Sequence, residues 1–497
     1  MFGRKTVTSV SVFLQICIIV AVFFLLCFYF EFFRYIYAAL VFTAVISVLC
    51  RGMPKESKIS WLIVLIILPF FGFTVYVLFS YNPIGKKTEN LLDNLKQQAN
   101  AYIPQRTTYE RALSPEQLLQ ADYIESVSGM SGYTNTDVRH YPYGERFFAD
   151  YLRDLESARD FIFLEYFLFG EGEMLNRVLS VLKGKAAEGV EVRIIYDDFG
   201  SVDRMSPRYA EELNKIGIKT IRFNKLVPIP APFHNNRNHR KITVIDGKIG
   251  YTGGINIADE YINLVSPYGV WKDTAIRLYG PAVDALSYFF LSDFLLATKT
   301  VEPIDRFMGK SVSVPCRGVV MPFCDGPKPL YDRLVTENAY INLIDSAHKY
   351  VWISSPYLVC DSRVKKSLIN AAARGVDVKI VVPHIPDKKL VFEIGRNNYK
   401  SLTDRGVKIY EYMPGFIHAK QLICDGVTAI VGSANLDYRS LLYNYENCVL
   451  MFNTDCISDI EKDFIGVFNR SADMDGFNQN GFKKVFCKVA GMISPLL

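Results

Sequence analysis

Residues 239–247 read His-Arg-Lys-Ile-Thr-Val-Ile-Asp-Gly, and residues 418–426 read His-Ala-Lys-Gln-Leu-Ile-Cys-Asp-Gly. Further along, both copies reach an asparagine, Asn256 in the first and Asn435 in the second. Average residue usage predicts about 0.02 occurrences of His-x-Lys-x4-Asp among six histidines. Two occurrences in matched surroundings therefore indicate an internal duplication.

The segments ahead of the two copies also match each other. A buried-strand pattern at 161–167 leads through a helical stretch to a second strand at 190–196, and the same order recurs at 350–357 and 376–382. Strands that alternate with helices favour parallel sheets with covered faces. A repeat of about 190 residues is a duplicated domain and not a solenoid. We therefore expect an α/β fold with two duplicated lobes related by a pseudo-twofold axis.

The first 85 residues contain long uncharged runs. Runs at 6–30 and 59–85 each exceed the length of about 20 apolar residues that a spanning helix needs, and a shorter run at 35–50 lies between them. The sequence predicts a multi-pass protein of the cell membrane, with two or three hydrophobic helices in a membrane region over 1–85. A juxtamembrane linker should follow over 86–135.

The duplicated unit accounts for the remainder, with lobe 1 expected over 136–310 and lobe 2 over 311–497. Half of the 497 residues are hydrophobic, which excludes a disordered polar chain. With 56 basic and 51 acidic residues the net charge is only +5, so we expect no nucleic acid as a partner. The ten cysteines form no Cys-x-x-Cys pair, and no Walker-type loop is present, so we expect neither a metal nor a cofactor.

Charges beside the apolar runs bear on the side of the membrane that holds the lobes. The positive-inside rule places Arg4 and Lys5, and also Arg51, Lys55 and Lys58, in the cytoplasm. Three spans would then put the lobes outside, whereas two spans with a re-entrant segment would put them inside. Seven cysteines after residue 300 favour the reducing interior. Both topologies stay open at this point.

Each motif copy predicts a strand that presents two reactive side chains on one face. Residues two apart on a strand point the same way, so His239 and Lys241 should enter the same cleft, as should His418 and Lys420. Two lysines suit a phosphodiester. One imidazole can attack phosphorus while the other protonates the leaving oxygen, and both tasks suit the near-neutral pKa of histidine.

The other motif residues have two interpretations. Asp246 and Asp425 precede glycine, a typical hairpin turn, so they either belong to the catalytic set or only shape the turn. The returning strand should bring Asn256 and Asn435 back to the histidines, where their amides could hold phosphoryl oxygens.

Both copies resemble the HKD motifs of the phospholipase D superfamily. The wider sequence resembles the bacterial cardiolipin synthases of that superfamily, including Leu-Pro-Phe-Phe-Gly-Phe at 68–73 and Gly-Ser-Ala-Asn-Leu-Asp-Tyr-Arg-Ser at 432–440. The resemblance covers nearly the whole chain. It implies transfer of a phosphatidyl group from one phosphatidylglycerol to another, giving cardiolipin and glycerol through a phosphatidyl-histidine intermediate without a nucleotide.

The resemblance also implies roles for particular residues. His239 would be the nucleophile, and His418 the general acid and then the base. Asp273 would orient His239, and Glu446 would orient His418. The phosphoryl oxygens would be held by four residues: Lys241, Lys420, Asn256 and Asn435.

Three alternatives to the transferase remain from the residues alone. A phospholipase D-type hydrolase would use the same phospho-histidine step with water as the acceptor. A phosphodiesterase acting on nucleic acid fits poorly with the membrane runs and the small net charge, and a lipid-binding scaffold fits poorly with two intact His–Lys sets. The expected partners are phosphatidylglycerol and the lipid bilayer, and the sequence indicates no particular oligomeric state.

Overall fold

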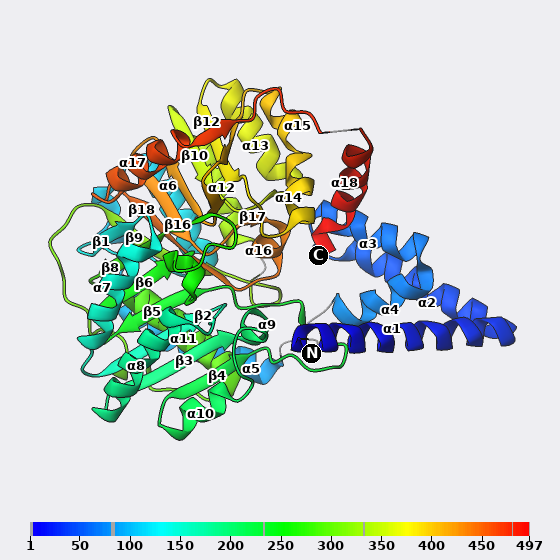
Figure 1. Cartoon of the computed structure of the whole chain (residues 1–497), viewed down its shortest axis with the longest axis horizontal. Coiled ribbons are helices and arrows are strands. Elements are labelled where there is room, and N and C mark those ends of the chain that lie inside the picture. The colour runs from blue at the N-terminus through cyan, green and yellow to red at the C-terminus, as the bar shows by residue number, and fades with distance from the viewer. Residues whose placement is uncertain (1–2, 81–84, 232–233, 332, 480, 497) are drawn as a thin grey trace.

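Two α/β lobes and an arm of N-terminal helices make up the computed structural model, which describes residues 3–80, 85–231, 234–331, 333–479 and 481–496. Figure 1 shows lobe 1 in green, lobe 2 in yellow to orange above it, and the blue helices α1 to α4 extending to the right. The two lobes share one strand order, which confirms the expected duplication.

Each lobe is built on one mixed sheet. The lobe 1 sheet has the order β1 (Asp137–Tyr141), β8 (Ala275–Tyr279), β6 (Ile249–Gly253), β5 (Lys241–Ile245), β2 (Phe161–Tyr166), β3 (Glu191–Asp197) and β4 (Lys219–Phe223). The lobe 2 sheet has the order β9 (Val319–Asp325), β18 (Glu446–Phe452), β16 (Thr428–Gly432), β15 (Gln421–Cys424), β10 (Tyr350–Ser354), β12 (Asp377–Pro383), β13 (Lys408–Tyr412) and β19 (Ser471–Asp473).

The parallel strands that the sequence predicts are present, but they are three of seven strands in the lobe 1 sheet and three of eight in the lobe 2 sheet. Strands β2, β3 and β4 are parallel, as are β10, β12 and β13. The remaining strands pair antiparallel, and the Asp-Gly turn folds each motif into a hairpin, β5–β6 in lobe 1 and β15–β16 in lobe 2.

Helices cover the sheets on both sides. The outer faces carry α7 (Gly144–Glu156) and α8 (Glu173–Ala187) in lobe 1, and α12 (Val335–Ser346) and α13 (Ser362–Ala373) in lobe 2. Between the lobes, α11 (Val283–Thr298) and α17 (Ile457–Phe468) contribute to one buried apolar core that both sheets share. Shorter helices complete the lobes: α9 (Asp198–Ser201), α10 (Tyr209–Lys215), α14 (Lys389–Arg396), α15 (Tyr399–Thr403) and α16 (Tyr438–Leu442).

The juxtamembrane segment is helical and packs on the lobes. It contains α5 (Lys86–Ala99) against α11 and α6 (Pro115–Ser128) against α12. Ser114 caps the start of α6. Its hydroxyl accepts from the Gln117 N–H, and the Gln117 side chain accepts from the Ser114 N–H. The expected domain boundaries stay predictions.

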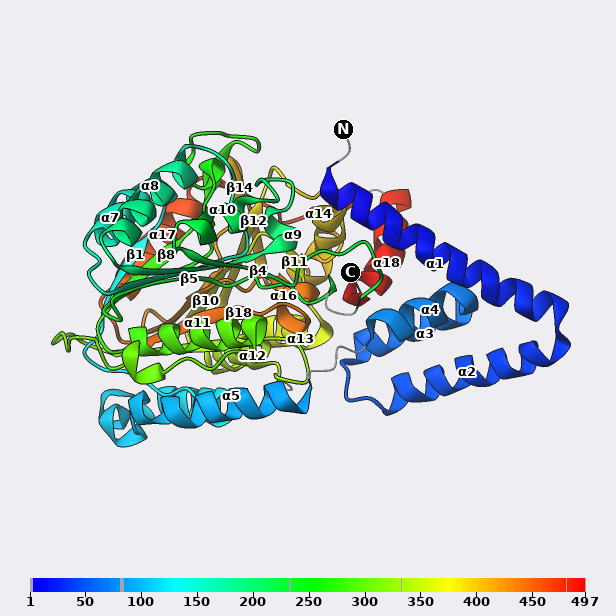
Figure 2. The ribbon, with the colours of Figure 1, turned by 90° about the horizontal axis from the view of Figure 1, so that it is seen from below.

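The arm differs from the predicted pattern of spans. Helices α1 (Arg4–Tyr29) and α2 (Glu31–Cys50) are each long and apolar enough to cross a bilayer. The expectation of one spanning helix over 59–85 is wrong in the described part of that range. The chain there forms α3 (Lys55–Ile67) and α4 (Pro69–Phe79), about 20 and 17 Å long, which pack against each other. Figure 2 shows α1 and α2 reaching away from the lobes.

The break between α3 and α4 has a local cause. Pro69 has no N–H to continue the helical bonds of α3, and proline disfavours a helical conformation for the residue before it. Gly72 then lets α4 fold back closely, since a Cβ there would clash with the carbonyl oxygen of Val64. A proline followed by a close-packing glycine therefore turns a hydrophobic run of spanning length into a hairpin of two short helices.

Candidate active site

The two motif histidines lie at the junction of the lobes, where the main chain of each lobe pairs with the other. Strand β7 (Val270–Lys272) of lobe 1 is parallel to β14 (Gly415–Ile417) of lobe 2. The His418 N–H donates to the Lys272 carbonyl oxygen at 2.7 Å, and the His239 N–H donates to the Tyr445 carbonyl oxygen at 2.9 Å. Asp273 follows Lys272 in the chain and Glu446 follows Tyr445, so this pairing holds His418 beside Asp273 and His239 beside Glu446.

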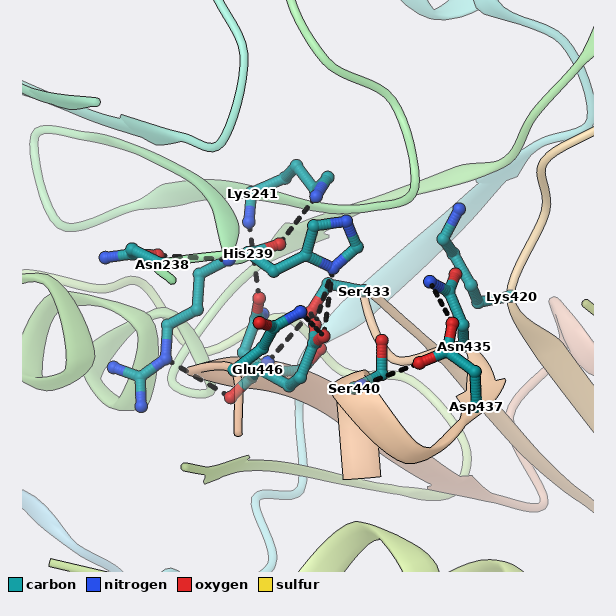
Figure 3. A network of polar contacts seen from close by, with 12 residues as sticks. Asn238, His239, Lys241, Lys420, Ser433, Asn435, Asp437, Ser440 and Glu446 are labelled. Carbon is teal, nitrogen blue, oxygen red and sulfur yellow. Dashed lines mark hydrogen bonds and ion pairs between the residues drawn. The ribbon is translucent and has the colours of Figure 1, made fainter. Parts of the chain in front are cut away.

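The histidine–carboxylate pairs in the structure are the reverse of the expected ones. His239 Nδ1 lies 2.9 and 3.0 Å from the two carboxylate oxygens of Glu446, and His418 Nδ1 lies 2.6 Å from Oδ2 of Asp273. Figure 3 shows the contact between His239 and Glu446. The expectation that Asp273 orients His239 and Glu446 orients His418 is wrong. A carboxylate from the other lobe holds each ring, so one lobe alone builds neither half of the site.

The two carboxylates experience different electrostatic surroundings, although both are fully buried. Burial raises the pKa of Asp273 to about 7, although Lys420 and the Thr274 N–H oppose the rise. Burial also acts on Glu446, but the His239 ring, Lys241 and the Ser433 hydroxyl outweigh it and lower its pKa. Glu446 therefore holds its charge more firmly than Asp273 does.

The motif lysines are buried beside the histidines. Lys241 Nζ donates to the His239 carbonyl oxygen at 2.5 Å, and Lys420 Nζ donates to that of His418. Burial lowers the pKa of Lys241 to about 7 and that of Lys420 to about 8, with Glu446 and Asp273 opposing the shift. Two buried cations next to each other favour an anionic ligand, because its charge would offset their mutual repulsion.

Burial and these cations also act on the imidazoles. Burial lowers the pKa of His239 to about 4, with Glu446 opposing and Lys241 adding to the shift. The pKa of His418 lies well below its usual value, because burial, Lys420 and Lys241 all disfavour its charged form. Both rings are neutral without ligand, and an arriving anion would raise both pKa values.

Aromatic rings enclose the histidines. The ring centroid of Phe167 is 5.1 Å from that of His239, and those of Tyr261 and Trp271 are 5.6 and 5.5 Å from that of His418. Each histidine is only 8% exposed. Because Nδ1 of each ring is already bound, Nε2 is the nitrogen that can meet a reactant, and the surrounding rings limit access of bulk water.

The two motif asparagines are placed unequally. Asn256 uses both ends of its amide in the fold: Oδ1 accepts from the Leu168 N–H and Nδ2 donates to the Tyr261 hydroxyl. Asn435 Nδ2 donates to Asp437, while its Oδ1 is buried with no hydrogen-bond partner among the described residues. Phosphate contact by either asparagine remains a prediction, and the structure supports it less for Asn256.

The motif aspartates lie at the far ends of their strands, away from the histidines. The Asp246 carboxylate accepts from the N–H groups of Arg159, Asp160 and Phe161. Asp425 repeats this arrangement with three N–H groups at 348–350. Both take a positive φ, 52° and 54°. They tie the hairpin to the start of the neighbouring strand, which supports the turn interpretation over the catalytic one.

Sequence reasoning missed several residues that support the histidines. Ser433 donates its hydroxyl to Glu446, and Lys272 forms a buried ion pair with Asp463 at 2.8 Å. Ser433 carried a usable signal, because it follows Gly432 in the second motif copy. The Lys272 pair carried none, because its partner lies 191 residues further along. Among the described residues, no group of three or more His, Cys, Asp or Glu side chains is arranged to hold a metal.

Comparison with known proteins connects this arrangement to a family. A family profile described as "Cardiolipin synthase, PLD-like domain" matches residues 151–271 and 340–467, and one described as "Phospholipase_D-nuclease N-terminal" matches residues 39–80. An uncharacterized protein of Streptococcus mutans is 38% identical, covering 90% of this chain and 96% of the relative. Cardiolipin synthase 2 of Bacillus cereus is 34% identical, with 89% and 87% covered.

The fold also has a solved counterpart. The crystal structure of phosphatidylserine synthase from Haemophilus influenzae superposes with a TM-score of 0.57 at 12% sequence identity, covering 73% of this chain and 95% of that one. At this identity the likeness concerns the fold alone.

Proposed function

The chain belongs to the cardiolipin synthase family of phospholipase D-like proteins and is a phosphatidyltransferase, and from this premise we propose how its own residues carry out the reaction. The donor and the acceptor are both phosphatidylglycerol, and the products are cardiolipin and glycerol. The observation that carries the proposal is the crossed pair of histidine–carboxylate contacts between the lobes, with a lysine beside each histidine.

In the first step His239 Nε2 attacks phosphorus and the bond from phosphorus to the glycerol oxygen breaks. Glu446 keeps the proton on Nδ1, so the lone pair is on Nε2, where the phosphodiester lies. The Asp273–His418 pair starts with Asp273 protonated and the ring proton on Nε2; the Nε2 proton passes to the departing glycerol oxygen while the Asp273 proton moves to Nδ1. Lys241 and Lys420 neutralise the charge on the non-bridging oxygens.

In the second step His418 acts as the base. It takes the proton from a glycerol hydroxyl of the second phosphatidylglycerol, whose oxygen then attacks phosphorus. The bond from phosphorus to His239 Nε2 breaks and the free enzyme returns. Because one phosphodiester replaces another of similar energy, no nucleotide is needed to drive the reaction.

The unlike carboxylates support this division of roles. Glu446, with its lowered pKa, is suited to stabilise positive charge on an attacking ring. Asp273 has a pKa raised by burial to about 7, so the Asp273–His418 pair retains a proton near neutral pH. A retained proton is what a general acid must supply.

Enclosure of the histidines favours transfer over the alternative of hydrolysis. At 8% exposure each, they offer little space to bulk water before the acceptor arrives. A cavity of about 490 Å³ lies where the membrane arm meets both lobes, with Arg51, Asn235, Tyr331 and Tyr443 among its lining residues. The Tyr331 hydroxyl accepts from Arg240, which follows His239 in the chain. The position of this cavity suits lipids that enter from the bilayer.

Product analysis tests the function. Purified protein in vesicles is given phosphatidylglycerol alone, and lipids and free glycerol are followed by mass spectrometry. Cardiolipin and glycerol appearing in equal amounts support the transferase. Phosphatidic acid and glycerol without cardiolipin would replace it with the hydrolase, and turnover by His239→Ala would overturn the nucleophile assignment.

We further propose that the protein crosses the membrane twice, with both lobes in the cytoplasm. The start of α1 lies against lobe 1: the Lys5 N–H donates to Asp203 at 3.2 Å and the Arg4 guanidinium to Asp198 at 3.4 Å. After α2, the Gly52 carbonyl oxygen accepts from Lys328 of lobe 2 at 2.8 Å. Both helices therefore have an end on the lobe side, which gives α1 and α2 opposite directions across the bilayer.

The flanking charges support the cytoplasmic side. The basic residues at the start of α1 and around α3 lie at the lobe end of the arm, and the positive-inside rule assigns this end to the cytoplasm. Labelling of introduced cysteines from outside the cell would test the proposal. A cysteine at the α1–α2 turn, near Phe30, should react from outside, and one at Leu119 in α6 should not; the opposite result would overturn it.

A further inference from the structure

The last helix, α18 (Gly481–Ile493), lies between lobe 2 and the membrane arm. One face is covered: Cys487 is buried against Ile394 of α14 and Val359. Near its end, the Met492 carbonyl oxygen accepts from the Ser60 hydroxyl of α3 at 2.6 Å. The helix is therefore attached both to the lobe and to the arm.

The opposite face of α18 is apolar and uncovered. Phe482, at 89% exposed, is among the most exposed large apolar side chains of the described chain, and five others follow it at helical spacing. The full set is Phe482, Val485, Phe486, Val489, Met492 and Ile493. At 100° per residue these positions fall within an arc of about 120°. A continuous apolar face of this kind marks an interaction surface.

The charges of α18 indicate what covers that face. The helix has no acidic residue and three lysines. Lys483 pairs with Glu393 at 2.7 Å and Lys484 donates to Asn478 on the covered side, whereas Lys488 borders the apolar face on the helical projection. A basic, acid-free amphipathic helix suits a surface of anionic lipid headgroups above acyl chains. The helix also runs crosswise to α1 in Figure 1, as a helix in the membrane plane would.

We propose that α18 lies in the headgroup region of an anionic bilayer, with Phe482, Phe486 and Val489 among the acyl chains. The helix then fixes the height and tilt of lobe 2 above the lipid, so that the site between the lobes stays within reach of substrate. The proposal rests on the membrane anchoring of the arm and not on the identity of the reaction.

Depth-sensitive quenching tests it in the full-length protein. Phe486→Trp adds a tryptophan on the apolar face, and Ile465→Trp adds one at an exposed position (45%) of α17, on the side of lobe 2 away from the arm in Figure 1. Both variants keep the three native tryptophans as a common background. In bilayers of phosphatidylglycerol with brominated acyl chains, the added fluorescence of Phe486→Trp should be mostly lost and that of Ile465→Trp retained.

A second variant keeps the test independent of the first. Val485→Glu with Val489→Glu places two carboxylates on the exposed face and leaves the core unchanged. In the Phe486→Trp background this pair should restore the quenched fluorescence. The proposal is overturned if Phe486→Trp is quenched no more than Ile465→Trp, or if its emission changes with protein concentration and not with lipid bromination, which would indicate a second copy on this face. Neither readout needs turnover, so failure here leaves the proposed reaction untouched.

Discussion

Replacing the two site carboxylates separately should affect different parts of the reaction. Glu446→Gln removes the charge that holds the Nδ1 proton of His239, and Asp273→Asn removes the corresponding group at His418. If the contacts operate as the structure has them, the first change impairs attack on phosphorus and the second impairs protonation of the leaving oxygen. If each carboxylate instead served the histidine of its own lobe, Asp273 with His239 and Glu446 with His418, the two effects would be exchanged.

The size of the Glu446→Gln effect follows from its geometry. At 2.9 Å and an effective dielectric constant of about 20, a full positive charge on His239 attracts the carboxylate by about 6 kcal/mol. With about half of that charge developed in the transition state, the barrier rises by about 3 kcal/mol, or roughly 100-fold in rate. A glutamine amide that turns its NH₂ toward Nδ1 also moves the lone pair away from Nε2, which extends the loss toward about 10⁴-fold.

The assay uses a phosphatidyl ester of p-nitrophenol, whose leaving group needs no proton. Release of nitrophenolate in the first turnover reports attack by His239 alone. Asp273→Asn should stay within about tenfold of wild type on this ester while losing far more with phosphatidylglycerol. Glu446→Gln should be slow with both. A slow burst in Asp273→Asn together with a normal burst in Glu446→Gln would refute the assignment and make His418 the nucleophile.

Three other outcomes are expected. Asp246→Ala leaves three N–H groups without their acceptor and should lower the free energy of unfolding by about 2–3 kcal/mol in detergent while cardiolipin formation per folded molecule persists; loss of activity at unchanged stability would contradict this. The pKa of Lys241 lies near 7, so its charge is present below that pH and lost above it, and kcat/KM for phosphatidylglycerol should fall as pH rises past about 7–8. Lys241→Arg should make that fall shallower at a lower maximum, and the part that remains belongs to Lys420 and the Asp273–His418 pair. Gly72→Ala forces α4 away from the Val64 carbonyl and should cost about 1–3 kcal/mol in thermal unfolding. Gly85→Ala meets no atom within 4 Å and loses only the N-cap preference of α5, so it should cost about 0.5 kcal/mol; equal effects would argue against the hairpin packing.

Local chemistry made much of this protein predictable from sequence. The duplicated helix ends illustrate why: Gly189 and Gly375 take positive φ values of 91° and 89°, which glycine adopts without strain, so each helix ends at the expected place before the next strand. The Asp-Gly pairs likewise determine the two hairpins, because the turn needs residues that tolerate positive φ. The shared orientation of each motif histidine and its lysine is predictable in the same way, since residues two apart on a strand share a face.

Local sequence patterns did not predict correctly which hydrophobic runs of the N-terminal arm form helices of spanning length. Hydrophobicity identified the runs correctly, but length alone favoured a spanning helix over 59–85 and left the run at 35–50 in doubt. In the structure the run at 35–50 belongs to a helix of spanning length, whereas Pro69 breaks the run at 59–85 and Gly72 lets α4 fold back on α3. Whether a hydrophobic run spans or folds back depends on what packs beside it, which no hydropathy window contains.

The sequence by itself determined the duplicated α/β lobes, the two His–Lys sets and the apolar arm, because each follows from spacing, turn chemistry or hydrophobic length within one short segment. Only the tertiary structure decided which carboxylate holds which histidine, and that the Asp246 and Asp425 carboxylates bind N–H groups at the start of a neighbouring strand. The reason is that main-chain pairing between the lobes places Tyr445 beside His239 and Lys272 beside His418. Such contacts join residues more than 140 positions apart, and no local pattern records them.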